Sequence, residues 1–225
     1  MHRLLEEVPL FDGVNPCILR QISQKISLKK YKLNRVVVTE ASSNEYFYII
    51  KSGEVRVFRE NKDGEKIILA ILGEGEFFGE MSILESNLAS ASVITTQDSE
   101  FICIRDRQFM SMVKRTPSIS TRMFSNLSKR IRYCDDSIKN LNKHCTCDRV
   151  ATVLLYFAEK RGYRRSNSVV IKKMPFQYSI ASLAGISRES VSRAFNNLQD
   201  NDYIIKTGRE LVINDYQRFY EDFNK

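Results

Sequence analysis

The pattern of hydrophobic and polar positions changes along the chain. From about residue 27 to residue 105, short apolar runs rich in Val, Ile, Phe and Tyr alternate with polar turns that contain Gly. This alternation predicts β-strands, and many short strands in succession predict an all-β sandwich or barrel. Asp63-Gly64 between two such runs predicts a hairpin. The expected strands cover residues 36–38, 46–50, 55–58, 67–72, 91–96 and 101–104.

From about residue 107 the apolar residues recur at helical spacing. Along one stretch they lie three or four positions apart, and most residues between them are charged or polar. A stripe this narrow predicts a long helix that pairs with the same helix of a second copy. The alternative is an amphipathic helix that packs on its own domain. The residues of this dimer seam are Leu127, Ile131, Cys134, Ile138 and Leu141.

The last third of the chain predicts helices that end in a hairpin. Gly185-Ile186 reads as a tight turn between two helices, and Ser187 is a suitable N-cap for the second of them. Helix, helix, turn, helix and hairpin is the order of a winged helix-turn-helix. The expected elements are a helix over 148–161, a strand over 168–172, helices over 177–184 and 188–200, and hairpin strands over 203–206 and 210–213.

Charge and composition narrow the class of protein. The net charge of +8 is made up of −2 over residues 1–110, +6 over 111–147 and +4 over 148–225. The basic back half indicates a nucleic-acid partner. Five Cys at irregular spacing fit a cytoplasmic protein better than a disulfide scaffold, and acids near the N-terminus disfavour a signal peptide. No apolar run approaches the roughly 20 residues of a membrane span, so we expect a cytoplasmic protein with no membrane partner.

The helix-turn-helix stretch also has a recognisable sequence. Residues 180–198 read IASLAGISRESVSRAFNNL and resemble the helix-turn-helix of the CRP/FNR family of bacterial transcription regulators. Residues 52–58, 73–84 and 89–93 resemble the sensor domain of the same family, and the resemblance covers nearly the whole chain. It implies an α+β fold: a β jelly-roll sensor domain over residues 1–110, a dimerisation helix over 111–145 and a winged helix-turn-helix over 146–225.

The resemblance also implies which residues contact DNA. Arg pairs with guanine and Glu accepts from cytosine, so Arg188, Glu189 and Arg193 suit base reading in a TGA-containing palindrome, of the TGTGA or TTGNNA type. The structural alternative is that Glu189 and Arg193 form only an i,i+4 salt bridge. The base-reading residues implied are Arg188, Glu189, Ser192 and Arg193, and the phosphate contacts are Gln177, Ser187 and Ser190.

The pocket that holds cyclic AMP in the family departs from its pattern here. Gly79-Glu80 matches, and Glu80 would contact the ribose hydroxyl. Ala89 stands where the family has the Arg that pairs with the phosphate, and Ser90 follows it. Cys134-Asp135 replaces the Thr-Ser pair that faces the base, and Asp135 adds a negative charge. Without the charge-assisted bond to phosphate, we expect an effector other than cyclic AMP.

One alternative keeps the fold but gives it a haem- or redox-responsive, or cyclic-nucleotide, sensor that gates DNA binding. His144-Cys145-Thr146-Cys147 would be its candidate metal, haem or thiol site. The simpler interpretation is that Cys145 belongs to the apolar stripe and Cys147 is a small residue near a helix cap. A single Cys-x-Cys pair also lacks the second pair of a tetrahedral zinc site.

Enzyme chemistry has little support in the sequence. We find no nucleophile–base pair, phosphate-binding loop or catalytic motif around the two histidines, so we expect no catalytic residues. The expected partners are double-stranded DNA, a second copy of the chain as homodimer, and RNA polymerase.

Overall fold

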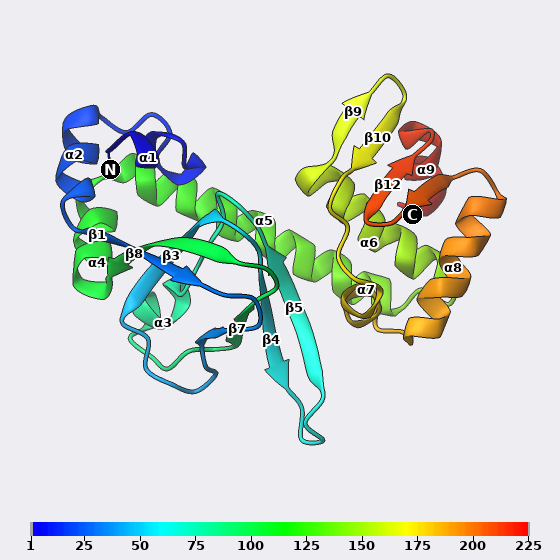
Figure 1. Cartoon of the computed structure of the whole chain (residues 1–225), viewed down its shortest axis with the longest axis horizontal. Helices are drawn as coiled ribbons and strands as arrows, with labels where there is room; N and C mark the ends of the chain where they lie inside the picture. The colour runs from blue at the N-terminus through cyan, green and yellow to red at the C-terminus, as the bar shows by residue number, and fades with distance from the viewer. Residues whose placement is uncertain (1, 225) are drawn as a thin grey trace. The chain divides into compact units, whose positions relative to one another are not determined.

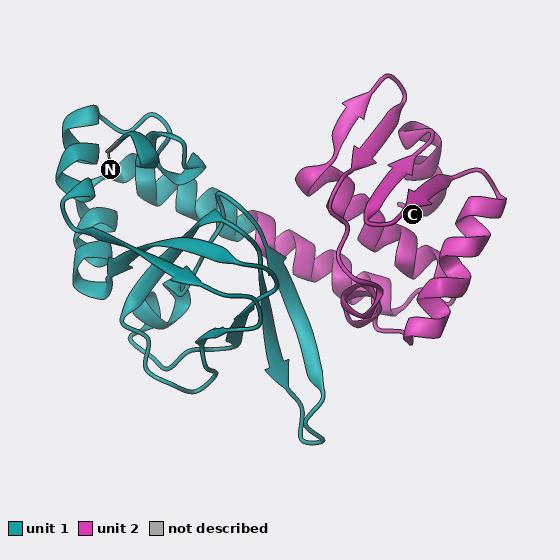
Figure 2. Cartoon of the chain, in the orientation of Figure 1, with its two compact units in different colours: residues 1–128 teal, residues 129–225 magenta. Residues whose placement is uncertain are grey.

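The computed structural model describes residues 2–224. The chain divides into two compact units, unit 1 over residues 1–128 and unit 2 over residues 129–225 (Figure 2). The division falls within helix α5 (Pro117–Leu141), whereas the sequence places its boundaries at residues 110 and 145. The three-part division therefore stays an interpretation. Unit 1 has 17 Lys and Arg against 16 Asp and Glu, and unit 2 has 18 against 11, so most of the positive charge belongs to unit 2.

Unit 1 is a jelly roll of two antiparallel sheets with helices beside them (Figure 1). One sheet has the order β1-β8-β3-β6 and the other β2-β7-β4-β5. The strands are β1 (Ile26–Tyr31), β2 (Val36–Val38), β3 (Tyr46–Ser52), β4 (Val55–Glu60), β5 (Lys66–Leu72), β6 (Phe77–Phe78), β7 (Ser92–Thr95) and β8 (Ser99–Arg105). The helices are α1 (His2–Glu6), a 3-10 turn over Pro9–Phe11, α2 (Pro16–Ser23), α3 (Glu80–Glu85), α4 (Asp106–Arg115) and the first part of α5.

All six strands expected from the sequence are confirmed, and the structure adds β1 and β6. The sequence ISLKKY of β1 has no clean alternation, because this edge strand is mostly exposed. The β6 strand has only two residues. Neither produces a periodic signal long enough to detect.

The middle strands of the first sheet are buried on both faces. Successive side chains of a strand point to opposite faces, so Ile102 and Ile104 of β8 join one core cluster while Phe101 and Cys103 join another. The neighbouring strand β3 divides in the same way, with Phe47 in the first cluster. The first cluster also includes apolar residues of α2, α4 and the start of α5. The second cluster lies between the two sheets.

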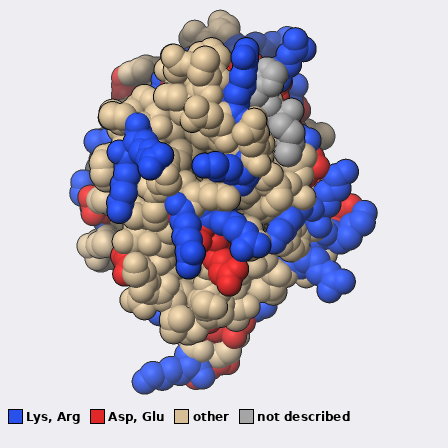
Figure 3. All heavy atoms as spheres, turned by 90° about the vertical axis from the view of Figure 1, so that its left-hand side faces the viewer, with Lys and Arg blue, Asp and Glu red and all other residues tan. Residues whose placement is uncertain are grey.

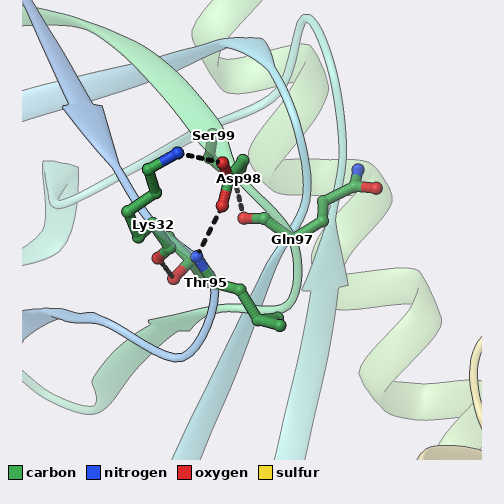
Figure 4. Close-up of polar contacts among 6 residues, drawn as sticks. Lys32, Thr95, Gln97, Asp98 and Ser99 are labelled. Atoms are coloured by element: carbon green, nitrogen blue, oxygen red, sulfur yellow. Dashed lines mark hydrogen bonds and ion pairs between the residues drawn. The ribbon is translucent and has the colours of Figure 1, made fainter.

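A polar corner fixes the β1–β2 loop to the β7–β8 turn (Figure 4). Asp98 accepts from Lys32 Nζ at 2.7 Å and from the backbone N–H of Leu33 at 2.9 Å. These two bonds hold the pKa of the Asp98 carboxyl below its usual range. The fully buried Thr95 hydroxyl donates to the Lys32 carbonyl at 2.7 Å and accepts from the Arg35 N–H at 2.8 Å. Since the Lys32–Asp98 pair is exposed, the buried hydroxyl gives the corner more of its order than the ion pair does.

Basic side chains gather on one side of unit 1 (Figure 3). Lys29 Nζ lies 3.9 Å from the centre of the Tyr46 ring, and the Arg105 guanidinium lies 5.7 Å from the same ring. Because the positive and negative charges of unit 1 nearly cancel, the positive charge of this face results from an uneven distribution of basic side chains over the surface. The elements on this side carry Arg20, Lys29, Lys30, Arg107, Lys114 and Arg115.

Unit 2 is a winged helix-turn-helix around the buried helix α6. Its sheet has the order β11-β12-β10-β9. Each element expected from the sequence is present, and the structure adds the short strand β9 and the helix α9, whose Phe219 is fully buried. No described helix is both long enough and apolar enough to cross a membrane. The elements are α6 (Thr146–Arg161), β9 (Tyr163–Arg165), β10 (Ser168–Ile171), α7 (Gln177–Ala184), α8 (Arg188–Asp200), β11 (Ile204–Thr207), β12 (Glu210–Ile213) and α9 (Tyr216–Phe223).

Candidate nucleic-acid interface and effector pocket

Helix α8 has one buried and one exposed face. The side chains that attach it to α6 and α7 are buried, and they recur three or four positions apart: Val191, Ala194, Phe195 and Leu198. The exposed face is polar and remains available to a partner. It carries all four residues for which the sequence implies base reading: Arg188, Glu189, Ser192 and Arg193.

The first turn of α8 is fixed by its N-cap. The Ser187 hydroxyl accepts from the Ser190 N–H at 3.2 Å, as the sequence predicts. Arg193 Nη2 lies 3.2 Å from the Ser190 hydroxyl. Hydrogen bonds from its own backbone N–H and from the Ser187 hydroxyl hold the pKa of Glu189 below its usual range. Among the residues that the structure describes, no ion pair joins Glu189 to Arg193, so the structural alternative of an i,i+4 salt bridge is not what orients them.

The turn before α8 depends on Gly185. Its φ of +63° is left-handed, and it ends α7 with Gly185 N–H donating to Ser182 O and Ile186 N–H donating to Ala181 O. A Cβ at this position would lie 2.6 Å from Leu141 Cδ2. Both the backbone conformation and the close side chain therefore require glycine here.

Two aromatic side chains at the start of α7 escaped the sequence analysis. Phe176 and Tyr178 are about half exposed, and their rings are parallel with centres 5.8 Å apart. Arg209, in the turn between β11 and β12, places its guanidinium 4.7 Å from the Phe176 ring and donates from Nε to Met174 O at 2.9 Å. Gln177, which the sequence assigns to phosphate, lies between the two rings in the chain. The sequence signal that could have indicated them is a pair of aromatic residues on either side of Gln177 at the start of a helix.

Two of the four pocket residues that lie in unit 1, Gly79 and Ala89, are hydrogen-bonded to one segment, residues 41–46. Gly79 has φ +84° at the start of α3, and its carbonyl accepts from Asn44 Nδ2 at 3.2 Å. Ala89 is 7% exposed, and its backbone bonds Ser42 O and the Ala41 N–H. Glu80 is buried, and Ser90 is exposed with its hydroxyl 3.8 Å from a thioether sulfur. Asn44, which the sequence did not indicate, also donates to Tyr46 O and to the Ser82 hydroxyl, and so links this segment to the start of α3.

Aromatic rings fill the jelly-roll interior next to Ala89. The rings of Tyr48 and Phe78 stack with centres 4.8 Å apart, and Phe101 meets both of them edge-on. Tyr31 packs on Phe101 from the other side. All belong to or pack against the cluster that contains Ala89. Burial raises the pKa of Tyr48, so its phenol stays neutral.

An open cavity of about 320 Å³ adjoins this interior. Glu45 gives it an acidic group, and no Lys or Arg is among the residues that line it. Such a lining favours a neutral or cationic ligand over a phosphate. The cavity is lined by Val37, Val38, Thr39, Ser42, Ser43, Asn44, Glu45, Tyr46 and Tyr48.

The other two predicted pocket residues, Cys134 and Asp135, are exposed on α5 and belong to unit 2. The two groups of predicted pocket residues therefore belong to different units.

Residues of the predicted dimer seam have two different environments. Leu127 is partly buried against the first core cluster of unit 1, as the own-domain alternative expects. Ile131 and Ile138 are each 62% exposed and Leu141 is 52% exposed, and Cys134 is exposed as well. Phe124, one heptad before Ile131, is 65% exposed and extends the stripe beyond what the sequence analysis included.

Cys145 and Cys147, at the start of α6, have different environments. Cys145 is the exposed N-cap of α6, while Cys147 is partly buried with Sγ 3.4 Å from Asn197 Oδ1. Burial raises the pKa of the Cys147 thiol to about 11, and Cys145 and Asp148 add to the shift. His144 is exposed. Across residues 2–224, no three His, Cys, Asp or Glu side chains gather as metal ligands would.

The fold and these two sites define a class of protein: a transcription regulator with a sensor domain and a DNA-binding domain. The Cyclic nucleotide-binding domain model matches residues 28–116, and the Crp-like helix-turn-helix domain model matches residues 148–221. The chain belongs to the CRP/FNR family of bacterial transcription regulators.

Similar proteins cover almost the full chain. The CRP-like cAMP-activated global transcriptional regulator of Mycobacterium tuberculosis is 26% identical over 97% of both chains. The Cyclic AMP receptor protein of Thermus thermophilus is 28% identical over 87% of this chain and 88% of its own. Among solved structures, a CooA mutant from Carboxydothermus hydrogenoformans is 21% identical with a TM-score of 0.77, over 90% of this chain and 89% of its own. At that identity the structural match shows the fold alone.

Thiol chemistry tests the environment assigned to Cys147. With a pKa of about 11, about one Cys147 side chain in ten thousand is thiolate at pH 7. We expect iodoacetamide to label Cys145 before Cys147, and the rate at Cys147 to rise about tenfold for each pH unit up to that pKa. Mass spectrometry of time points would measure both sites, with unfolded protein as the control. Equal rates at neutral pH would contradict the buried environment.

Proposed function

We propose that this chain is a dimeric, sequence-specific DNA-binding regulator that reads a TGA-containing palindrome and responds to an effector other than cyclic AMP. RNA polymerase is the further partner in this proposal. The observation that carries the proposal is the exposed polar face of α8, which presents two arginines and a glutamate side by side at the start of the helix. No catalytic step is part of the proposed function.

Support for base reading comes from the chemistry and placement of the face. Arg presents two donors to guanine O6 and N7, and Glu accepts from cytosine N4. Glu189 is a carboxylate, and therefore an acceptor, at neutral pH, and its hydrogen bonds lower its pKa further. The net positive charge of unit 2 adds the sequence-independent attraction to phosphate on which specific contacts depend.

Support for a dimer comes from the exposed stripe of α5. Phe124, Ile131 and Ile138 recur every seven residues with more than half of each side chain exposed. Large apolar side chains at heptad spacing on one helix favour pairing with an identical helix. Two copies related by a two-fold axis would read two half-sites about one helical turn apart.

Support for a different effector comes from the Ala89 region. Ala89 supplies no cation where the family has an arginine, and the neighbouring cavity has no Lys or Arg among its lining residues to pair with a phosphate. Tyr46 and Tyr48 give the cavity aromatic lining instead. The curated relatives from Mycobacterium tuberculosis and Thermus thermophilus are named for cyclic AMP, so the proposal separates this chain from them by ligand.

Replacing Arg193 by Ala tests the reading face. Loss of a bidentate base contact costs about 1–3 kcal/mol of discrimination, so we expect weaker binding to a TGA palindrome and relaxed preference at the guanine. Fluorescence anisotropy on matched and substituted duplexes would measure both. Arg165→Ala is the control, because Arg165 is an exposed arginine on β9. If R193A keeps full discrimination, α8 does not read bases through this side chain.

Replacing Ile138 by Glu tests the dimer. A charge in a paired apolar seam must be desolvated, so we expect the dissociation constant of the dimer to rise about tenfold or more. Analytical ultracentrifugation would measure it. Lys139→Glu, one exposed position away from the stripe, is the matched control and should leave the mass unchanged. A wild-type chain that sediments as a monomer would contradict the proposal.

Replacing Ala89 by Arg tests the effector assignment. The wild-type chain should show no heat of binding with cyclic AMP, whereas an added guanidinium should strengthen affinity about tenfold to a hundredfold. Leu88→Arg, at a half-exposed neighbouring position, adds the same charge outside the core and should not. Circular dichroism would check that both variants fold. Micromolar binding of cyclic AMP by the wild-type chain would overturn this part of the proposal.

A further inference from the structure

One arginine of unit 2 binds three separate stretches of backbone. Arg149 lies in the first turn of α6 and is partly buried. Its Nη2 donates to Leu141 O at 2.7 Å, its Nε to Lys143 O at 2.8 Å and its Nη1 to Gly185 O at 3.3 Å. The three acceptors belong to the end of α5, to the elbow between α5 and α6, and to the turn of the helix-turn-helix. Such a fork of donors is a property of Arg that Lys lacks.

The helix-end carbonyl oxygens that accept these bonds have no hydrogen-bond donor within their own helix. The last carbonyls of a helix have no partner within it, and Leu141 is the last residue of α5. The carbonyl of Gly185 lies at the left-handed turn between α7 and α8. Charged hydrogen bonds to both ends therefore satisfy acceptors and fix the distance between them.

Packing and a second hydrogen bond reinforce this junction. Leu141 Cδ2 lies only 2.6 Å from the position that a Cβ on Gly185 would take. Asn140, which is 2% exposed, donates from Nδ2 to Arg149 O at 3.2 Å. The elbow is also anchored on its other side, because Lys143 Nζ donates to Thr152 Oγ1 and to Phe223 O. The end of α5 and the turn that precedes the reading helix are thus parts of one small, well-connected cluster.

We propose that Arg149 is the positioning residue that fixes the reading helix α8 to the end of the dimer helix α5. It touches no DNA in this proposal and acts through the Gly185 turn. The inference rests on the proposed function in one respect, the pairing of two chains along α5. In such a dimer, Arg149 sets how far apart and at what angle the two α8 helices are presented, so it determines the half-site spacing that the protein accepts.

The test is the dependence of binding on spacer length. Wild-type protein is measured on a TGA palindrome of its preferred spacing and on duplexes with one base pair added or removed. We expect the wild type to lose about tenfold or more in affinity on the altered spacers, because half-site spacing is a geometric requirement. Arg149→Ala should bind the preferred duplex about tenfold more weakly and should lose most of its dependence on spacer length.

Two further variants separate positioning from charge and from folding. Arg149→Lys keeps the charge and the aliphatic stem, so it should fold even if R149A does not, and it should behave like R149A because one amine cannot bind three carbonyls. Arg165→Ala removes an exposed charge elsewhere in unit 2 and should keep the spacer dependence of the wild type. Affinity for a single half-site should change little in R149K, since the reading face is intact.

The outcomes are distinct. A steep spacer dependence that persists in R149K and R149A would overturn the role of Arg149. A wild type that binds as a dimer but tolerates every spacer would also overturn it, because no spacing would then be set. A wild type without preference for any palindrome would instead contradict the proposed function itself.

Discussion

The sensor unit depends on two strands that are buried on both faces. Strands β3 and β8 lie side by side in one sheet, and each sends alternate side chains into a different core cluster. A one-residue shift in their register would exchange the two sets of side chains. Because one cluster holds the helices and the other fills the jelly roll, this register determines both where α5 begins and what surrounds Ala89. The fold, the effector region and the base of the dimer helix thus share one constraint.

The parts of the fold with strong local signals could be predicted from the sequence. Val- and Ile-rich runs gave six strands, and Gly185 with its Ser187 cap located the helix-turn-helix within a residue or two. The exposed edge strand β1 and the short strands β6 and β9 lack a clear period, and tertiary packing determines them. Helix α9 does have aromatic residues at helical spacing, Tyr216, Phe219, Tyr220 and Phe223, but the sequence analysis did not use them. Leu127 shows the limit of the heptad pattern, because its spacing fits the seam while its side chain packs on unit 1.

The candidate sites divide in the same way. The polar face of α8 could be located because helical spacing alone places its residues together. Asn44 and Arg149 could not be identified, because each acts on backbone atoms from distant parts of the chain. Cys147 looked like a ligand by its spacing, and its contact with α8 shows a thiol packed into the DNA-binding unit. The absence of an arginine at residue 89 was visible at once, whereas the ring cluster beside it depends on the pairing of distant strands.

The exposed stripe of α5 also bears on how the protein responds to its own abundance. Few apolar side chains contribute to it, and one member of the heptad pattern, Leu127, is already partly buried in unit 1. If the proposed pair dissociates when the chain is scarce, the concentration of dimer depends on the square of the chain concentration. Operator occupancy then grows with the square of chain concentration rather than in proportion to it. Cells with twice as much of the protein would then show about four times the operator occupancy at low saturation, by mass action. The number of copies of the gene would therefore affect regulation more than in proportion.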